Sequence, residues 1–235
     1  MLHTLALSLA LIVPAVLDSL PHRSDHFTQG LFWEKAKLWE STGLEGHSGL
    51  YKMDSKGHIL DSLRLPYPHF GEGAVMAGGR ISWLTWKSHV GFTVEPGSMR
   101  FSGQFPLPTE GWGITLWRDR LVVSNGSSEL LLLSPGDHRV TGSVRVRAKG
   151  LAVENLNELE MVGDTLYANV WQSDSIAVIA MPSGEVSRWM DMSALARAVR
   201  KRSPRAEVLN GIAWDGAYLW VTGKFWPQVY KLRQR

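Results

Sequence analysis

Five short motifs recur along this chain at nearly equal intervals, and this repetition limits the fold more than any other feature. The motifs combine polar or small residues with apolar ones and occupy residues 27–31, 70–74, 111–115, 156–160 and 209–213. Aligned at residues 30, 73, 113, 158 and 211, they lie 43, 40, 45 and 53 residues apart. This period is typical of one propeller blade. The sequence therefore predicts an all-β fold, a five-bladed β-propeller.

A second motif follows each first motif at an almost constant distance. It reads Glu-Ser-Thr-Gly at 40–43, Leu-Thr-Trp-Lys at 84–87, Val-Ser-Asn-Gly at 123–126, Ala-Asn-Val-Trp at 168–171 and Val-Thr-Gly-Lys at 221–224. Its last residue lies 13 or 14 residues beyond the aligned position. That distance fits one strand, a turn and an antiparallel return strand. Both motifs are expected at the same radius of each blade.

Equivalent positions of the five blades should converge on one axis, because the innermost strands of a propeller line its channel. One expected ring contains Gln29, Glu72, Trp112, Asn157 and Asn210, and a second contains Gly43, Lys87, Gly126, Trp171 and Lys224. Unlike side chains in matched places favour a reaction site. The period alone leaves open that these side chains only satisfy turns.

The rest of the chain fits one propeller domain over residues 15–235. Strands expected at 209–214, 218–224 and 228–232 leave the last blade one strand short, and residues 15–20 are expected to supply it. Pairing of this N-terminal strand with the C-terminal one would close the ring and remove exposed edges. Residues 192–202 are rich in helix formers and stop before Pro204, so they predict one short helical insertion.

The first fourteen residues are interpreted as a signal peptide or an N-terminal extension. The apolar run 5–13 resembles the hydrophobic part of a secretory signal, although a basic start and a small-x-small cleavage site are missing. We therefore expect a periplasmic or secreted protein. The run is too short to span a bilayer, so no stable membrane insertion is expected.

Composition excludes several kinds of site. The chain has no cysteine, which rules out disulfides, thiolate metal sites and a cysteine nucleophile. Its eight histidines show no HExxH pair or zinc-like spacing and are interpreted as surface or packing residues, so neither a metal nor a cofactor is predicted. The net charge of +3 and the basic run in 192–202 are interpreted as a solvated helix face, with no nucleic-acid partner.

Taken together and in order, the motifs resemble the plant and bacterial type of glutaminyl-peptide cyclotransferase, also called glutamine cyclotransferase. The resemblance runs from about residue 17 to residue 232 and includes Phe-Thr-Gln-Gly-Leu at 27–31, Gly-Glu-Gly at 71–73, Leu-Asn-Glu-Leu-Glu at 156–160 and Val-Thr-Gly-Lys-Phe-Trp-Pro at 221–227. It implies a five-bladed propeller enzyme. Such an enzyme converts the N-terminal glutamine of peptides and proteins to pyroglutamate and releases ammonia, without a metal.

The resemblance also implies roles for individual residues. Glu72 matches the carboxylate that transfers the proton, and Asn157 and Lys224 match positions that polarise the carboxamide. Whether burial or the charge of Lys224 controls the pKa of Glu72 stays open at this point. Gln29 is expected to bond the substrate. The aromatic residues at channel-facing motif positions are expected to wall the substrate pocket: Phe27, Phe70, Trp86, Trp112 and Trp171, with Trp83 as a further candidate.

Some questions stay open in the sequence. Glu45 and His47 depart from the family pattern, which leaves the preference for the second substrate residue undecided. A non-catalytic propeller that binds peptides or a protein partner through its channel face is the alternative. A metal-dependent hydrolase would need several acidic ligands, yet Glu72 is the only acid among the ten ring positions. We expect a monomer.

Overall fold

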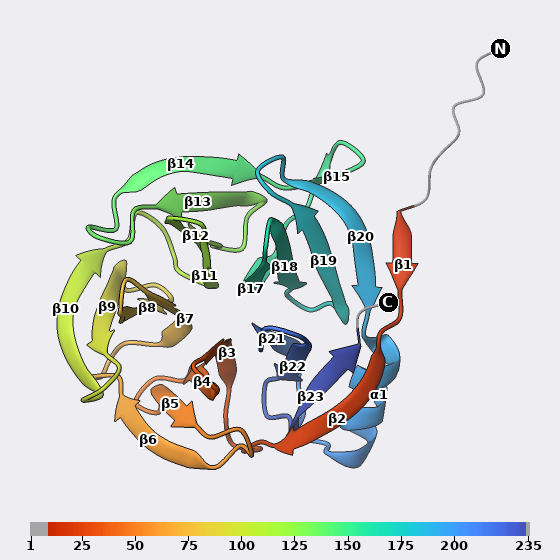
Figure 1. Ribbon diagram of the computed structural model, residues 1–235, viewed down its shortest axis with the longest axis horizontal. Helices are drawn as coiled ribbons and strands as arrows, with labels where there is room; N and C mark the ends of the chain where they lie inside the picture. Colours follow the sequence, from red (N-terminus) through yellow and green to blue (C-terminus); the bar gives the residue numbers. More distant parts are fainter. Residues whose placement is uncertain (1–8, 234–235) are drawn as a thin grey trace.

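The computed structural model describes residues 9–233, and its strands form five sheets set around a central axis (Figure 1). The first sheet consists of β3 (Thr28–Glu34), β4 (Lys37–Thr42), β5 (Gly49–Met53) and β6 (Ile59–Arg64). The second consists of β7 (Gly71–Ala77), β8 (Arg80–Thr85), β9 (Val90–Glu95) and β10 (Arg100–Pro106). The third consists of β11 (Ile114–Trp117), β12 (Arg120–Val123), β13 (Glu129–Leu133) and β14 (Val140–Arg145).

The last two sheets differ from this simple pattern. The fourth contains β17 (Leu156–Val162), β18 (Thr165–Val170), β19 (Ser175–Ala180) and β20 (Glu185–Asp191), extended by β15 (Arg147–Ala148) and β16 (Leu151–Ala152). The fifth contains β21 (Leu209–Trp214), β22 (Leu219–Gly223) and β23 (Gln228–Arg233) together with β2 (Ala15–Pro21) from the other end of the chain. The prediction of an all-β, propeller-like fold with one short helix is confirmed.

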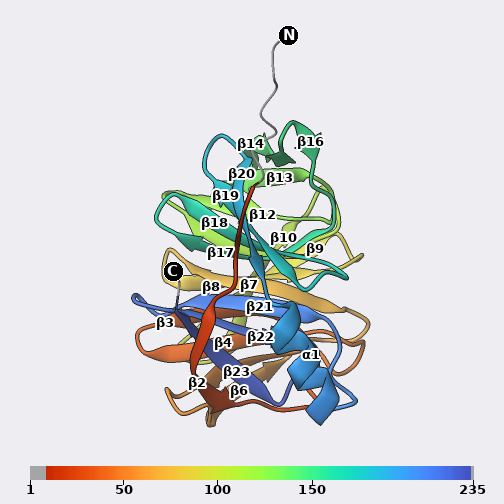
Figure 2. The same ribbon diagram turned by 90° about the vertical axis from the view of Figure 1, so that its right-hand side faces the viewer.

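The N-terminal segment joins two neighbouring sheets. Strand β2 pairs antiparallel with β23, so that Ala15 lies opposite Arg233 and Pro21 opposite Gln228. Before it, β1 (Ala10–Ile12) pairs in parallel with β20 of the fourth sheet. Figures 1 and 2 show the chain passing along the outside of the ring from the fourth sheet to the fifth. Residues 1–8 of the segment expected to be a signal peptide or extension lie outside the described residues.

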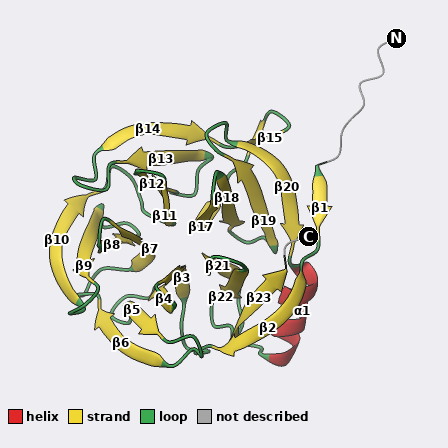
Figure 3. Cartoon of the chain, viewed as in Figure 1, coloured by secondary structure: helices red, strands yellow, loops and turns green. Residues whose placement is uncertain are grey.

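The helix α1 (Ser193–Arg202) lies on the outer side of the ring, between β20 and β21 in the chain (Figure 3). It begins one residue later than predicted, where the carboxylate of Asp191 accepts a hydrogen bond of 2.8 Å from the N–H of Ser193. Its buried residues, Ala196 and Val199, pack against the fourth and fifth sheets. No helix within residues 9–233 has the length and apolar character that crossing a bilayer requires.

The core lies between neighbouring sheets rather than in one central mass. Five buried clusters join the first sheet to the second, the second to the third, the third to the fourth, the fourth to the fifth and the fifth to the first. Alternating apolar residues of each strand supply these clusters, as expected for strands with both faces covered. Trp39, Trp117, Trp220 and Trp226 are among the residues packed in these clusters.

Two buried carboxylates of β17 tie the innermost strands together near the axis. Glu158 accepts the N–H groups of Leu31, at 3.2 Å, and of Ile212, at 2.8 Å. Glu160 accepts the N–H of Trp214 at 2.8 Å. Burial raises the pKa of Glu160 to about 8, and burial together with the charge of Glu160 raises the pKa of Glu158 well above its usual range. The motif at 156–160 therefore connects the fourth sheet to the first and the fifth.

Candidate active site

The nine predicted site residues all sit at one end of the sheets. Six of them lie near the start of an innermost strand: Phe27, Gln29, Phe70, Glu72, Trp112 and Asn157. The other three directly follow the second strand of their sheet: Trp86, Trp171 and Lys224. These two strands are antiparallel, so both positions fall on the same face of the ring. The motif spacing thus places side chains from different sheets around one opening.

These residues enclose one cavity of about 240 Å³. Its lining consists of Phe27, Gln29, Phe70, Glu72, Trp86, Trp112, Asn157, Trp171 and Lys224. Of the residues that the sequence singled out for catalysis or substrate binding, all but Trp83 are therefore part of the same hollow. The volume suits a small side chain folded on itself better than an extended peptide.

The carboxyl group of Glu72 is held by a short chain of amides. Gln29 donates a hydrogen bond of 2.9 Å from Nε2 to Oε1 of Glu72. Asn210 in turn donates from Nδ2 to Oε1 of Gln29, at 3.1 Å, and to the carbonyl of Thr28, at 3.0 Å. In the free protein Gln29 thus orients Glu72. Its contact with substrate stays a prediction.

Burial controls the ionisation of both charged residues in the cavity. It raises the pKa of Glu72 well above the usual range, against the opposing effect of Lys224 and with the help of the negative charge of Glu110. It also lowers the pKa of Lys224, against the opposing effect of Glu72. The question that the sequence left open is answered: desolvation outweighs the attraction between the two groups. Both are shifted toward their uncharged forms, as proton-transfer groups often are.

Asn157 brings an unsatisfied amide to the cavity. Its side chain is 4% exposed, and its Oδ1 has no hydrogen-bond partner within residues 9–233. The backbone carbonyl of Asn157 accepts a 2.6 Å hydrogen bond from the hydroxyl of Ser124, which fixes the start of β17. A buried acceptor without a partner costs free energy, so this oxygen is available to accept a hydrogen bond from an N–H group of a ligand, while the Nδ2 of the same amide can donate.

Aromatic rings form a nearly continuous wall around the cavity. The ring centroids of Phe27 and Phe70 lie 6.0 Å apart, those of Phe70 and Trp86 5.6 Å apart, and those of Trp112 and Trp171 5.8 Å apart, all in edge-on arrangements. Such geometry is favourable for aromatic pairs. The rings of this wall come from the first four sheets. Together they keep water away from the buried carboxyl group of Glu72.

Glu110 bridges two tryptophans of this wall, and the sequence analysis missed it. Its Oε2 accepts hydrogen bonds from the indole Nε1 atoms of Trp86, at 2.8 Å, and Trp112, at 3.0 Å. Three residues before the aligned glycine of the third motif, Glu110 occupies the position that Phe27 and Phe70 hold in the first two motifs. Beginning the third motif one residue earlier would have found it.

Two glycines of the second predicted ring leave space for the wall. A Cβ atom at Gly43 would collide with the ring of Phe70, and one at Gly126 would lie 2.7 Å from Cη2 of Trp112. Lys87, from the same predicted ring, is exposed and does not line the cavity; its Nζ lies 4.0 Å from the centre of the Trp86 ring. Trp83 also differs from expectation, because it is buried in the core between the first and second sheets.

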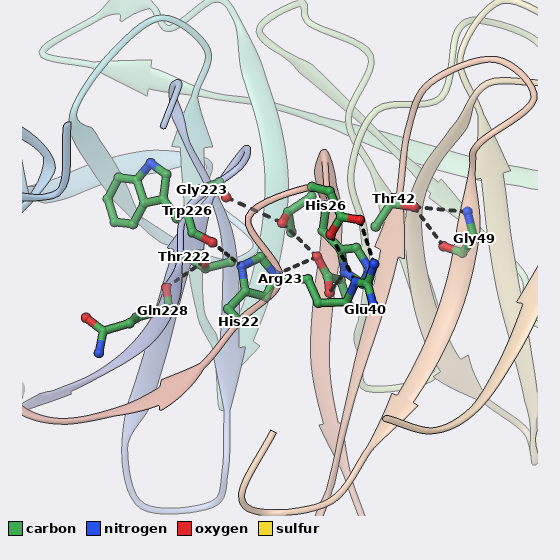
Figure 4. A network of polar contacts seen from close by, with 12 residues as sticks. His22, Arg23, His26, Glu40, Thr42, Gly49, Thr222, Gly223, Trp226 and Gln228 are labelled. Atoms are coloured by element: carbon green, nitrogen blue, oxygen red, sulfur yellow. Dashed lines mark hydrogen bonds and ion pairs between the residues drawn. The ribbon is translucent and has the colours of Figure 1, made fainter. Parts of the chain in front are cut away.

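A buried polar cluster lies where the first and fifth sheets meet (Figure 4). Glu40 is fully buried and accepts hydrogen bonds from His22 Nε2 at 2.9 Å, His26 Nδ1 at 2.8 Å and Thr28 Oγ1 at 2.7 Å. The other ring nitrogen of His22 donates to the carbonyl of Trp226. Both nitrogens of His22 therefore face acceptors, which is the arrangement of a positively charged imidazolium.

The pKa values of this cluster agree with a buried ion pair. Burial would lower the pKa of His22, but the charge of Glu40 and the hydrogen bonds outweigh it and raise the pKa. Burial would raise the pKa of Glu40, but the charges of His22 and His26 hold it far below its usual range. The interpretation of all histidines as surface or packing residues is thus incomplete for these two.

His22, His26 and Glu40 also have the residue types of a metal site, with ligand atoms within 4.8 Å of one another. Ligand atoms at about 2.0–2.1 Å from a tetrahedral zinc ion lie about 3.3 Å apart. The contacts of 2.8 and 2.9 Å to Glu40 are shorter than this and fit direct hydrogen bonds. The cluster is therefore best described as a structural ion pair.

Comparison with known proteins identifies the family. A family model described as glutamine cyclotransferase matches residues 4–234. The chain belongs to the glutamine cyclotransferase family. It is 38% identical over 226 residues to a glutaminyl-peptide cyclotransferase of Arabidopsis thaliana, and the match covers 93% of this chain and 70% of the relative.

Solved structures support the same family. The crystal structure of the glutaminyl cyclase of Myxococcus xanthus matches this cyclotransferase family member with a TM-score of 0.89 and 33% identity, over 96% of this chain and 98% of the other. The hydrazine synthase of Kuenenia stuttgartiensis matches with a TM-score of 0.52 and 14% identity, over 86% of this chain and 56% of the other. The second match concerns the fold alone.

Proposed function

We propose that this cyclotransferase converts an N-terminal glutamine to pyroglutamate in the cavity described above, with Glu72, Asn157 and Lys224 as its catalytic residues. The observation that carries the proposal is the buried carboxyl of Glu72, with its raised pKa, in the same aromatic hollow as an amide and an amine. The substrates are peptides and proteins whose first residue is glutamine. Family membership favours this enzyme over a non-catalytic, peptide-binding propeller.

The first step forms the lactam bond. The neutral α-amine of the substrate attacks the side-chain carboxamide carbon, and its proton passes to the carboxylate of Glu72. A free α-amine has a pKa of about 7.7–8.0, so a carboxylate with a raised pKa is a better match than an ordinary one. The electron pair of the carbonyl moves to oxygen, where hydrogen-bond donors from Asn157 and Lys224 stabilise the negative charge.

The second step releases ammonia. The oxyanion collapses, the bond from carbon to the departing nitrogen breaks, and protonated Glu72 returns its proton to that nitrogen. Ammonia leaves, and Glu72 is a carboxylate again. One carboxyl group thus serves as base and then as acid, and no proton is consumed.

The aromatic wall supplies the third requirement, a glutamine folded upon itself. Phe27, Phe70, Trp86, Trp112 and Trp171 restrict the side chain to conformations that bring the amine close to the carboxamide. Exclusion of water strengthens the electrostatic effects of Asn157 and Lys224. Gln29 keeps Glu72 in place and would contact the substrate from the floor.

We propose that the reaction needs no metal, because the donors already present supply the charge stabilisation that a Lewis acid would give. Glu72 is the only carboxylate among the described residues that line the cavity. We also interpret the five sheets as blades of one propeller domain over residues 15–235, closed by β2 and β23. Residues 1–14 stay a proposed signal peptide or extension of a periplasmic or secreted protein.

Incubation with a glutaminyl dipeptide amide, with and without a strong chelator, tests the proposal directly. Mass spectrometry should show loss of ammonia from the peptide at the same rate in both samples. Unchanged substrate would overturn the proposed function, and a rate that disappears with the chelator and returns with added metal would overturn the metal-independent mechanism.

A further inference from the structure

A second cavity adjoins the proposed glutamine pocket and is not used by the mechanism. Its volume is about 360 Å³, compared with about 240 Å³ for the pocket. Phe27 lines both. Phe225, which also lines the second cavity, packs against Phe27 with ring centroids 5.3 Å apart. The two hollows therefore meet at Phe27.

The fifth sheet adds no aromatic ring to the described lining of the pocket. Its five rings come from the first four sheets, and among the described lining residues only Lys224 comes from the fifth sheet. A peptide whose first residue fills the pocket must leave through the rim. Where the fifth sheet meets the first, the pocket adjoins the second cavity at Phe27, so the chain can continue from one hollow into the other there.

Arginine side chains surround the second cavity at this exit. Arg23, Arg64 and Arg205 line it, and Asp25 is its one carboxylate among the described residues. Arg23 and Asp25 form an ion pair at 2.6 Å and so neutralise each other. Neither Arg64 nor Arg205 forms an ion pair with any carboxylate of residues 9–233: Arg64 donates to the carbonyl of Gly46 at 2.8 Å, and Arg205 lies 5.6 Å from the centre of the Phe225 ring.

We propose that the second cavity is a subsite for the residue after the glutamine, and that Arg64 and Arg205 bind a carboxylate there. Arginine recognises carboxylates well because its planar group donates several parallel hydrogen bonds. The carboxylate can belong to an acidic side chain at the second position or to the free C-terminus of a dipeptide. This inference rests on the proposed function, since it needs a glutamine in the neighbouring pocket.

The test compares kcat/KM for four substrates: Gln-Glu-amide, Gln-Lys-amide, Gln-Ala-amide and Gln-Ala with a free C-terminus. The two carboxylate substrates should be preferred over Gln-Ala-amide by about threefold to tenfold, mainly through KM, and Gln-Lys-amide should be the poorest. The preference should shrink in high salt, since the arginines are exposed. A gain for Gln-Glu-amide alone assigns the subsite to a side chain, and a gain for free Gln-Ala alone assigns it to the C-terminus.

The Arg64→Gln/Arg205→Gln double variant tests whether these two arginines cause the preference for carboxylate substrates. Its ratio of Gln-Glu-amide to Gln-Lys-amide should fall toward one, whereas Arg100→Gln, on the outer strand β10 of the second sheet, should keep the ratio of the unaltered protein. Equal rates for all four substrates, or a preference that survives in the double variant, would overturn the subsite. Failure to cyclise even Gln-Ala-amide would instead overturn the proposed function itself.

Discussion

The Nε2 atom of Gln29 donates a hydrogen bond of 2.9 Å to Oε1 of Glu72. This bond joins the innermost strands of the first and second sheets at the floor of the cavity. The other carboxyl oxygen, Oε2, does not accept this hydrogen bond and can therefore take the proton of the substrate amine. The bond also gives a buried, easily protonated carboxyl one fixed orientation, which general acid–base catalysis requires.

Replacement of Glu72 by glutamine should abolish turnover while leaving substrate binding largely intact. The new amide would keep the shape of the side chain and an oxygen that accepts from Gln29, but it could not take up the amine proton. We expect kcat to fall by about 10²–10⁴-fold, with little change in the melting temperature. Glu185→Gln, an exposed position on β20, is the matched control. Normal ammonia release by the Glu72 variant would refute its role.

Glu110 should influence the pH dependence without touching substrate. Its negative charge raises the pKa of Glu72, so Glu110→Gln should lower that pKa. The rising limb of the kcat/KM profile should then move to lower pH by about half a unit, as loss of one nearby charge predicts. An unchanged pH profile would show that the charge of Glu110 does not affect the pKa of Glu72.

Two Glu110 variants distinguish the effect of its negative charge on Glu72 from the effect of its hydrogen bonds to Trp86 and Trp112. Glutamine at position 110 keeps an oxygen that can accept the indole N–H groups of Trp86 and Trp112, whereas alanine does not. Glu110→Ala should therefore raise KM several-fold more than Glu110→Gln. Equal KM values would indicate that the tryptophans hold their positions without this residue.

Glu160→Gln should stabilise the protein at alkaline pH. The folded-state pKa of Glu160 is about 8, above its usual value, so the native state retains a proton that the unfolded chain loses. Stability from this group is complete below about pH 4.5 and is lost as the pH rises through 8. The variant should melt about 2–5 °C higher than the unaltered protein at pH 9, and the difference should vanish near pH 5.

His22→Gln should weaken the protein in neutral and mildly acidic solution. The pKa of His22 is raised in the fold, so its stabilising charge is fully present below about pH 6.5 and is lost as the pH rises through the folded-state value. At pH 6 we expect a loss of about 3 kcal/mol, because Glu40 is left buried without its cation. The loss should be smaller at pH 9.

A matched control for this variant is available on the surface. His58 and Asp54 form a similar pair at 3.0 Å, but the side chain of His58 is 71% exposed. His58→Gln should change the unfolding free energy by less than about 1 kcal/mol at either pH. A similar response in both variants would contradict the argument that burial makes the His22–Glu40 pair important.

The sequence predicted the cavity residues well because the repeat places equivalent positions on one axis. Once the motifs were aligned, Gln29, Glu72 and Asn157 followed from the first motif and Trp171 and Lys224 from the second. The same alignment failed for Lys87, since a long side chain after a strand can turn outward into solvent. Periodicity gives the position of a Cα atom and not the direction of its side chain.

Other features depend on distant contacts that no local pattern contains. The His22–Glu40 pair joins residues 18 apart in sequence, and its partner carbonyl at Trp226 lies in another sheet. The balance between burial and attraction at Glu72 depends on how completely the surrounding rings exclude water. The strand β1 is short and apolar, so its residues gave no signal that distinguished a sheet edge from a secretory segment.

The contact between Gly43 and Phe70 has an evolutionary consequence. No side chain fits at position 43 while a phenylalanine occupies position 70 in its present place. Among proteins of this kind, substitutions at the two positions should therefore occur together: a residue larger than glycine at the first should accompany a smaller one at the second. Such coupled changes would mark lineages in which the pocket wall has a different shape and accepts different peptides.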